Sequence, residues 1–344
     1  MPRAADGYVP YKQLGYPGKG FSGDDLYAAP NPPFGALFTL HIKGDLRSLQ
    51  KARQAREEEL EKEGKTPPYP THDELRAEAA EEPPAYFLVV HDETGEVVRR
   101  LEAPKEKGIH RLAWDLRYPA PNPAQLEPPK LVNAYSSIPE GPLAAPGRFT
   151  VSLERRQLGK TVAVASAQPF EVRPLSATAL TAPDREALAA FLRSASALQR
   201  AALGASRLVA EALARVALVA KAIDSSAAPD TALADEARRI RRALEALEVR
   251  LDGDAAIAKR NDPVPPALVD RSTYIVYAHW SSTSTPTGTS RRQYELASAE
   301  LGEVVSALRQ LVASDLGALE ARLDAVGAPW TPGRVPIWPP AELP

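Results

Sequence analysis

The most regular apolar pattern in the chain runs from residue 187 to residue 223 and reads ALAAFLRSASALQRAALGASRLVAEALARVALVAKAI. Its apolar positions recur at alternating spacings of three and four, which is the period of one face of an α-helix. This first seam consists of Leu188, Phe191, Ala195, Leu198, Ala202, Ala205, Val209, Ala212, Val216, Val219 and Ile223. Because many of these residues are small, another helix can approach closely, and we expect one long helix packed against partners.

Two further seams with the same spacing follow. The second consists of Leu233, Ala237, Ile240, Leu244, Leu247 and Leu251. The third consists of Ala297, Leu301, Val304, Leu308, Leu311, Leu319, Leu323 and Val326, with a predicted helix cap at Ser290, three residues before Gln293. Between them, residues 262–289 are rich in Pro, Ser and Thr, hold the run YIVYAHW, and are predicted to be irregular. Residues 181–326 are therefore predicted to form an antiparallel bundle of three helices, or four.

Upstream of the helices the apolar period changes to two. Strands are predicted at 34–43, 109–115, 147–155, 161–165 and 170–172, and a hairpin from residue 86 turns at Gly95. Such short strands separated by turn signals predict an antiparallel β-sandwich over residues 31–176. A charged helical insertion interrupts it at about 46–82, with a capping box at Thr71 and Glu74. The predicted fold class is thus α+β, and a length of 344 residues allows two domains.

The two ends of the chain lack periodicity. Residues 1–30 are rich in Gly, Pro and Tyr and are predicted to be an extended arm that lies on another surface. Residues 327–344 form a Pro-rich tail that cannot be helical.

Composition excludes several classes of function. Lys plus Arg total 42 and Asp plus Glu total 44, so a net charge of -2 gives no electrostatic footprint for binding nucleic acid or an anionic membrane. No apolar run is long enough for a transmembrane segment. The absence of cysteine excludes disulfides, thiolate metal sites and cysteine nucleophiles. The N-terminus lacks the apolar core of a secretory signal, so the residues leave the compartment open.

Two motifs suggest a cofactor or a metal ion, and both have plainer interpretations. Gly18, Gly20 and Gly23 fit G-x-G-x-x-G, but no strand precedes them and no amphipathic helix follows, so we interpret them as part of the arm. A metal site built from His91 and His110 on neighbouring strands is an alternative to ordinary surface or half-buried imidazoles. We expect no cofactor.

The carboxylates Glu81, Glu82, Asp92 and Asp115 are candidates for acid–base chemistry. Glycoside hydrolysis needs two carboxylates at a fixed separation across a sugar cleft. The favoured interpretation is instead a solvated helix end, a turn residue and a strand-end residue.

The run Trp114-Asp115-Leu116-Arg117 has a structural interpretation. Strand alternation places Trp114 and Leu116 on one face, with Trp114 in the core, and Asp115 and Arg117 on the other. The Asp and Arg pair is then predicted to order the Pro-rich loop at residues 118–146.

Aromatic residues in the irregular segments are the candidate interaction residues, because no local core explains them. They are Tyr8, Tyr11, Tyr16, Phe21, Tyr27, Trp280, Trp330 and Trp338. Extended aromatic segments commonly pack onto a neighbouring domain or subunit, and stacking on a sugar is the alternative.

Six motifs in order carry a resemblance to a known family. They are NPPFGALFTL (31–40), YPTHDELRAEAAEEPP (69–84), HDETGEVVRRL (91–101), KGIHRLAWDLR (107–117), APGRFTVSL (145–153) and GAPWTPGR (327–334). Together they resemble the C-terminal region of bacterial sortilin-like β-propeller proteins, often labelled glycosyl hydrolase or neuraminidase-repeat proteins. The middle motifs also resemble the Ig-like domain of flagellar hook capping proteins, with a D-x-x-G hairpin ending at Gly95, a strand ending at Trp114 and Asp115, and a P-G-x-[YF] strand at Pro146 and Gly147.

The resemblance implies an Ig-like sandwich and a non-catalytic accessory region that packs against a β-propeller, in cis or as a separate subunit, of an exported protein. The propeller itself is missing: the sequence has no S-x-D-x-G-x-T-W box and no repeat of propeller-blade length. The glycosyl hydrolase label would then belong to the propeller, and we expect this chain to begin where a propeller would end. A carbohydrate-binding or glycoside-hydrolase-associated module is the alternative, and an enzyme in its own right is the third hypothesis.

Overall fold

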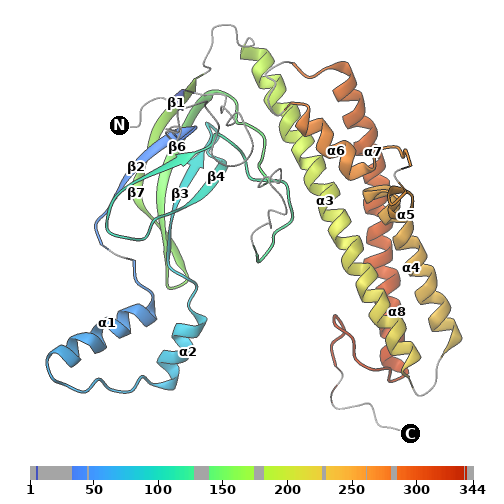
Figure 1. Cartoon of the computed structure of the whole chain (residues 1–344), viewed down its shortest axis with the longest axis horizontal. Coiled ribbons are helices and arrows are strands. Elements are labelled where there is room, and N and C mark those ends of the chain that lie inside the picture. The colour runs from blue at the N-terminus through green and yellow to red at the C-terminus, as the bar shows by residue number, and fades with distance from the viewer. Residues whose placement is uncertain are drawn as a thin grey trace, which may run out of the picture. The chain divides into compact units, whose positions relative to one another are not determined.

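The computed structural model describes residues 5–6, 33–44, 46–127, 139–173, 182–226, 230–260, 262–279, 285–336 and 338. The chain divides into two compact units, Met1–Pro119 with Leu131–Glu186, and Ala120–Lys130 with Ala187–Pro344. We call them the strand unit and the helical unit. The first contains the β-sheets and the second contains only helices and loops, so the fold is mixed α+β with largely antiparallel sheets (Figure 1).

Two sheets make up the strand unit. The larger has the strand order β1-β7-β6-β3-β4, and its neighbours are antiparallel except for the two-residue β1, which is parallel to β7. The smaller pairs β2 with β5 in antiparallel register. The strands are β1 (Ala5–Asp6), β2 (Ala36–Ile42), β3 (Ala85–His91), β4 (Val97–Ala103), β5 (Gly108–Trp114), β6 (Gly147–Gln157) and β7 (Lys160–Arg173).

The β3–β4 hairpin turns at Gly95, whose φ is +84°, as the sequence predicts. One strand prediction is wrong: the separate strands at 161–165 and 170–172 are a single strand, β7. The register against β6 shifts twice along it. Such irregularities leave residues unpaired and interrupt the alternation that a sequence pattern detects.

Residues from both sheets share one hydrophobic cluster. At its centre the Trp114 side chain is completely buried and meets Phe149 and Phe170 edge-on, at centroid distances of 5.2 and 6.1 Å. Phe38 of the smaller sheet meets Phe170 at 5.1 Å. Edge-to-face pairs of this kind add to the free energy of apolar burial, so these rings join the two sheets.

The predicted insertion is a pair of helices, α1 (Leu49–Lys62) and α2 (His72–Ala80). Ser48 caps α1, and Thr71 forms the predicted capping box with Glu74. Neither helix has a buried residue, so apolar packing does not explain how they stay together.

An ion pair links the two helices instead. The guanidinium of Arg53 donates to both carboxylate oxygens of Glu78, at 2.6 and 3.0 Å, and to Glu57 at 2.7 Å. These hydrogen bonds hold the pKa of Glu78 below its usual value. The bidentate geometry fixes the position of α1 against α2.

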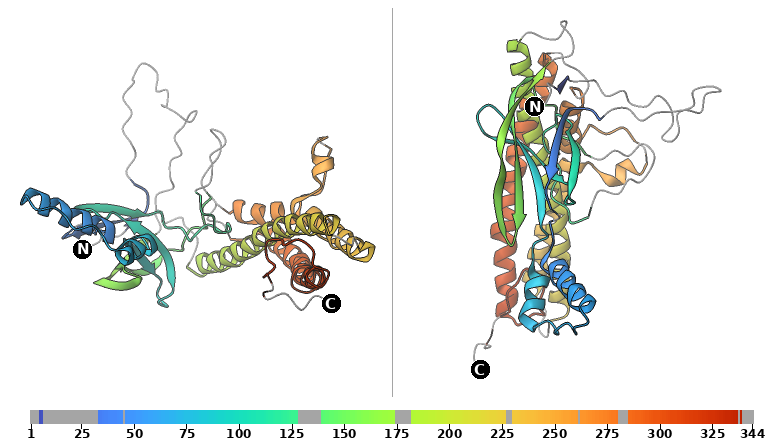
Figure 2. Two further views of the ribbon diagram at one scale, coloured as in Figure 1. Left: turned by 90° about the horizontal axis from the view of Figure 1, so that it is seen from below. Right: turned by 90° about the vertical axis from the view of Figure 1, so that its left-hand side faces the viewer.

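In the helical unit, the helices are α3 (Ala182–Asp224), α4 (Thr231–Asp252), α5 (Ala255–Ala258), α6 (Leu268–Tyr277), α7 (Gly288–Arg309), a π-helical segment η1 (Gln310–Leu316) and α8 (Gly317–Ala325). Every residue of the first and second predicted seams is buried. The third is buried except for Val326, which follows the end of α8 and is exposed. Figures 1 and 2 show α7 and α8 as one continuous rod beside α3.

The π-helical segment changes the register of the third seam. Leu311 and Leu316 are both buried, although they are five residues apart. A π-turn closes from residue i to i+5, so it returns Leu316 to the core face. A strict three-and-four spacing does not include Leu316, which is why the sequence pattern omitted it.

Two predictions about residues 262–290 are wrong. Part of that stretch is the helix α6, in which Leu268, Ile275 and Val276 face the core. Ten residues after a Pro-rich run give too short a pattern for recognition from sequence. The next helix is capped by Thr287, whose hydroxyl accepts from the backbone N–H of Ser290, so Ser290 lies inside the first turn.

The tip of the β6–β7 hairpin provides a test of backbone strain. Leu158 and Gly159 form a two-residue turn with φ of +53° and +69°. A bulky residue is disfavoured in the left-handed region, whereas Asn is accepted there. We expect Leu158→Asn to raise the free energy of unfolding of the strand unit by about 1 kcal/mol in urea denaturation.

Gly159→Ala is the matched variant and should lower the free energy of unfolding, because alanine is disfavoured at the positive φ of this position. An added Cβ would meet no atom within 4 Å, so steric contact does not contribute to the effect. A loss of stability in Leu158→Asn would show that packing of the leucine side chain outweighs the strain.

Candidate functional site

The Trp114–Arg117 run forms a corner after β5. The indole N–H of Trp114 donates to the backbone oxygen of Arg117 at 2.9 Å, and the Asp115 carboxylate accepts from the Arg117 N–H at 3.0 Å. Leu116 has a φ of +59°. The corner thus turns the chain sharply while Trp114 stays in the core.

This turn corrects the predicted alternation. Trp114 and Leu116 are buried as predicted, but Arg117 is also buried, with 6% of its surface exposed, while Asp115 stays partly accessible. The reason is that β5 ends at Trp114 and the left-handed Leu116 breaks the period of two.

Arg117 contacts the described end of the Pro-rich loop. Its guanidinium donates to the backbone oxygen of Gly141 at 3.1 Å and lies 3.1 Å from the carboxylate of Glu140. Burial lowers the pKa of Arg117, and the charges of Glu140 and Asp115 oppose that shift. Arg117 therefore positions residues 140–141, as the sequence interpretation proposed for the pair, whereas Asp115 acts on the corner itself. Pro146 and Gly147 lead directly into β6.

One candidate interaction segment that the structure describes is the C-terminal loop, residues 327–334. It starts where α8 ends. The N–H of Gly327 donates to the backbone oxygen of Asp324, and the N–H of Ala328 donates to the backbone oxygen of Leu323. Gly327 has a φ of +63°. This is the Schellman arrangement, which favours glycine at that position. The sequence TPGR then forms a turn in which the N–H of Arg334 donates to the oxygen of Thr331, with Gly333 at a φ of +98°.

The turn returns Arg334 to the end of α8. Its guanidinium is buried and donates to the Asp324 carboxylate at 2.8 and 2.5 Å and to the backbone oxygens of Pro329 and Ala328 at 2.7 and 3.3 Å. A buried charge with this many partners fixes a loop that has no regular secondary structure.

Trp330 is held by the same loop and faces solvent. Its indole N–H donates to the backbone oxygen of Arg334 at 2.6 Å, yet 58% of the residue is exposed. Trp338 is 87% exposed. The structure thus presents at least one predicted interaction aromatic in a fixed orientation.

The remaining predicted aromatics lie outside the described residues. This applies to Tyr8, Tyr11, Tyr16, Phe21, Tyr27 and Trp280, and to the glycines of the G-x-G-x-x-G motif.

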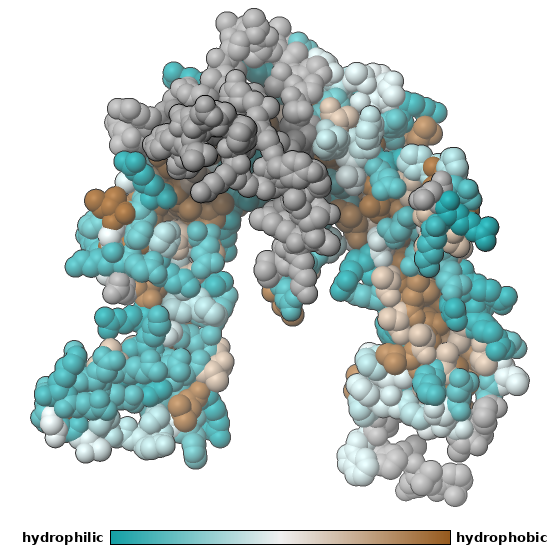
Figure 3. Space-filling view, in the orientation of Figure 1, coloured by the Kyte–Doolittle hydropathy of each residue, from teal (hydrophilic) through white to brown (hydrophobic). Residues whose placement is uncertain are grey.

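Two exposed aromatics were not singled out from the sequence. Tyr274 and Tyr277 lie on α6, one helical turn apart, with 60% and 70% of their surfaces exposed. Their signal is the YIVY run, but it lies in a stretch whose Pro, Ser and Thr content predicts an irregular connection. Helix α3 also carries Leu208 and Leu218, with 40% and 45% of their surfaces exposed. Figure 3 shows a brown, hydrophobic stripe along the helical unit.

His279 is the buried imidazole of the helical unit, with 6% of its surface exposed. Its Nε2 lies 3.2 Å from the hydroxyl of Ser290, and its ring packs edge-on against Phe191. Its Nδ1 has no hydrogen-bond partner within the part of the chain that the structure describes. Burial lowers the pKa of His279 from its usual value of 6.5.

The predicted metal pair is not brought together as neighbouring strands of one sheet. His91 lies at the end of β3 in the larger sheet and His110 on β5 in the smaller one, where its Nε2 lies 2.8 Å from the backbone oxygen of Glu106. Over the described ranges, no group of three or more His, Cys, Asp or Glu side chains is placed to hold a metal ion.

The four candidate carboxylates have separate surroundings. Asp92 accepts from the backbone N–H groups of Thr94 and Glu96 and so shapes the hairpin turn. Glu82 pairs with Arg156 at 2.6 Å. Glu81 is different: it is not a solvated helix end, because its Oε2 accepts from the N–H of Leu49 at 2.7 Å and its Oε1 is buried.

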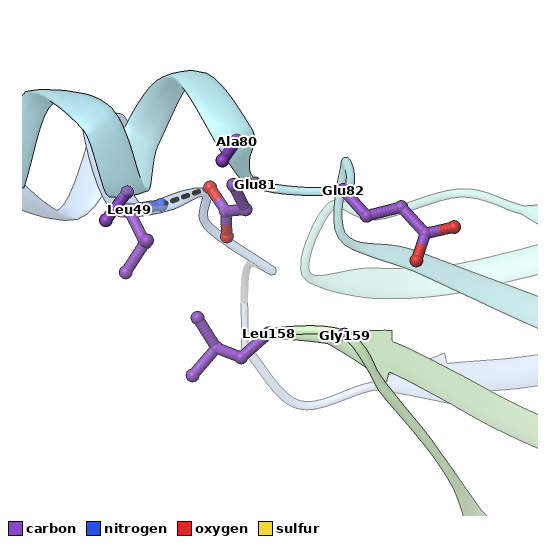
Figure 4. A pocket seen from close by; sticks show the side chains of 7 residues that line it. Leu49, Ala80, Glu81, Glu82, Leu158 and Gly159 are labelled. Atoms are coloured by element: carbon purple, nitrogen blue, oxygen red, sulfur yellow. Dashed lines mark hydrogen bonds between the residues drawn. The ribbon is translucent and has the colours of Figure 1, made fainter.

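Glu81 lines a cavity of about 350 Å³ between the insertion and the β6–β7 hairpin, together with Leu49, Ala77, Ala80, Glu82, Leu158 and Gly159 (Figure 4). A more open hollow of about 420 Å³ lies on α2 and is lined by His72, Leu75, Arg76 and Ala79.

Within the described ranges, none of the helices has both the length and the apolar composition needed to cross a membrane.

Comparison with protein-family models, with curated proteins and with solved structures found no match.

The C-terminal loop can be tested through its buried charge. Arg334→Met leaves Asp324 without its main partner, and removing one member of a buried pair costs about 3–5 kcal/mol. We expect the loop to open and chymotrypsin to cleave faster after Trp330, as measured by mass spectrometry.

Arg322→Met is the control. Arg322 lies on α8, as Asp324 does, but it is half-exposed and its contact with an Asp230 oxygen is long, at 3.9 Å, so its loss should cost little stability. Equal cleavage rates in the two variants would contradict the role assigned to Arg334.

His279 predicts a pH dependence of stability. Its pKa is lowered in the folded state, so the unfolded state takes up the proton first as pH falls. The contribution of neutral His279 to the free energy of unfolding is therefore fully present above about pH 6.5. It declines as pH falls from 6.5 to the folded-state pKa.

We expect the free energy of unfolding of His279→Gln to fall less than that of the wild type over about two pH units, from pH 7.5 to pH 5.5. Urea denaturation followed by circular dichroism measures it. His72→Gln, on the exposed side of α2, should behave as the wild type. Parallel pH profiles for the wild type and His279→Gln would refute this assignment.

Proposed function

We propose that this chain is a non-catalytic interaction module that packs against a β-propeller, in cis or as a separate subunit, of an exported sortilin-like protein. The observation that carries the proposal is Trp330: its indole is held by a hydrogen bond in a loop that the Arg334–Asp324 ion pair fixes, yet 58% of the residue is exposed. A pre-ordered aromatic side chain loses little conformational entropy when a partner covers it, which is the property of an interface hot spot.

The same proposal includes a finer description of the fold. The strand unit would be an Ig-like β-sandwich, supported by the single core that Trp114, Phe149, Phe170 and Phe38 form between the two sheets. The helical unit would be an antiparallel bundle of three principal helices, supported by the core that the three seams share. Half-exposed Leu208 and Leu218 on α3 would enlarge the contact surface.

Calorimetric titration with a sortilin-like propeller from the same genome, produced separately, tests the proposal. Trp330→Ala should weaken binding about tenfold or more, while the helical unit keeps its helix content and melting temperature. Tyr69→Ala is the control, because Tyr69 is an aromatic on the insertion that is even more exposed, at 95%.

Two results would overturn the proposal: no binding to the propeller by the wild-type chain, or undiminished binding by Trp330→Ala.

A carbohydrate-binding module is the second candidate, and the exposed pair Tyr274 and Tyr277 supports it. Two aromatic rings one helical turn apart offer a platform on which a sugar ring can stack. Oligosaccharide titration followed by tyrosine and tryptophan fluorescence separates the two candidates, since a propeller interface predicts no response to sugars.

A further inference from the structure

The cavity beneath the helical insertion combines apolar walls with one unsatisfied charged atom. Its walls come from three places: Leu49 at the start of α1, Ala77 and Ala80 on α2, and Leu158 at the tip of the β6–β7 hairpin. Figure 4 shows the Glu81 side chain between the helix ends and that tip. Its volume of about 350 Å³ is within the range of pockets that hold small groups.

The two oxygens of Glu81 are not equivalent. Oε2 accepts from the N–H of Leu49 at 2.7 Å and so satisfies the first turn of α1. Oε1 is shielded from water and has no hydrogen-bond partner among the described residues. Figure 4 shows this second oxygen directed toward Leu158 across the cavity. A buried carboxylate oxygen without a donor carries a desolvation cost that a donor would remove.

The nearby arginines are committed elsewhere. Arg156 pairs with Glu82 at 2.6 Å and donates to the backbone oxygen of Pro83. Arg53 binds Glu78 and Glu57. Among the described residues no donor reaches Oε1 of Glu81, so a bound group can supply one.

We propose that this cavity binds a lysine side chain of a partner polypeptide, with the ammonium on Glu81 Oε1 and the aliphatic stem against Leu49 and Leu158. The single free oxygen is the reason for choosing an ammonium. A guanidinium binds a carboxylate best through two parallel hydrogen bonds, and the Leu49 N–H already occupies Oε2. An ammonium is a compact donor that needs one oxygen, and its four-carbon stem matches apolar walls.

This site lies in the strand unit and uses none of the aromatic residues of the proposed function. Its test is therefore independent of the propeller experiment.

The probes are N-acetyl-lysine N-methylamide and N-acetyl-norleucine N-methylamide, which share the aliphatic stem and differ in the ammonium. Each is titrated into the ¹⁵N-labelled full-length protein and followed by amide chemical shifts. We expect the lysine compound to shift the amides of Leu49, Leu158 and Gly159 and to bind about tenfold more tightly than the norleucine compound.

Glu81→Gln should abolish that preference while preserving the fold, because its amide oxygen can still accept from the N–H of Leu49. The matched control is Glu82→Gln, which removes a neighbouring charge of the same cavity that is already paired with Arg156, and it should keep the preference.

The proposal is overturned if the lysine compound produces no shifts at these amides, if the norleucine compound binds equally well, or if Glu81→Gln keeps the preference. A further titration uses N-methylguanidinium in place of the lysine compound. Binding as tight as that of the lysine compound would overturn the choice of an ammonium.

Discussion

Arginine side chains that donate to backbone carbonyls hold the Pro-rich segments of this chain in place. The sequence contains 34 prolines, and each removes a backbone N–H while leaving a carbonyl that needs a donor. Arg117 supplies one to Gly141, Arg156 to Pro83 and Arg334 to Pro329. A guanidinium has five N–H groups and no acceptor, so it suits a backbone that has surplus oxygens. Residues 140–141 and the C-terminal loop are both positioned in this way.

The two units are stabilised differently away from these loops. The helical unit rests on the apolar seam of α3, whose small residues allow close helix packing, and its third seam stays in register through a π-turn at Leu311–Leu316. The strand unit has an aromatic core centred on Trp114. Its helical insertion contributes no buried residue and is attached by charge, through Arg53 and through Glu81 at the start of α1.

That attachment explains why the cavity at Glu81 lies where it does. Helices held by ion pairs need not pack tightly against the strands below them, so space remains between α1, α2 and the Leu158 tip. One carboxylate oxygen is used to attach α1, and the other has no donor among the residues that the structure describes. Polar contacts also fix the C-terminal loop of the helical unit, and they leave the Trp330 ring exposed.

The sequence by itself determined the elements whose side chains repeat with a regular period. The seams of α3 and α4, the turn at Gly95, the capping box at Thr71 and the burial of Trp114 all follow from local pattern, because neighbours in the chain set helix and strand periodicity. The mixed α+β class follows from the same patterns.

Only the tertiary structure decided the rest. The burial of Arg117 required the left-handed Leu116 and a loop 24 residues away, and the role of Arg334 required Asp324 on another element. The helix α6 could not be recognised from sequence, because its apolar residues pack against α4 and α7, which lie elsewhere in the chain. The sequence around Glu81 predicts a solvated helix end. It holds no sign of Leu49, 32 residues earlier, whose N–H donates to one of the Glu81 oxygens. Partners distant in sequence decide the burial and hydrogen bonding of polar groups, and periodicity carries no information about them.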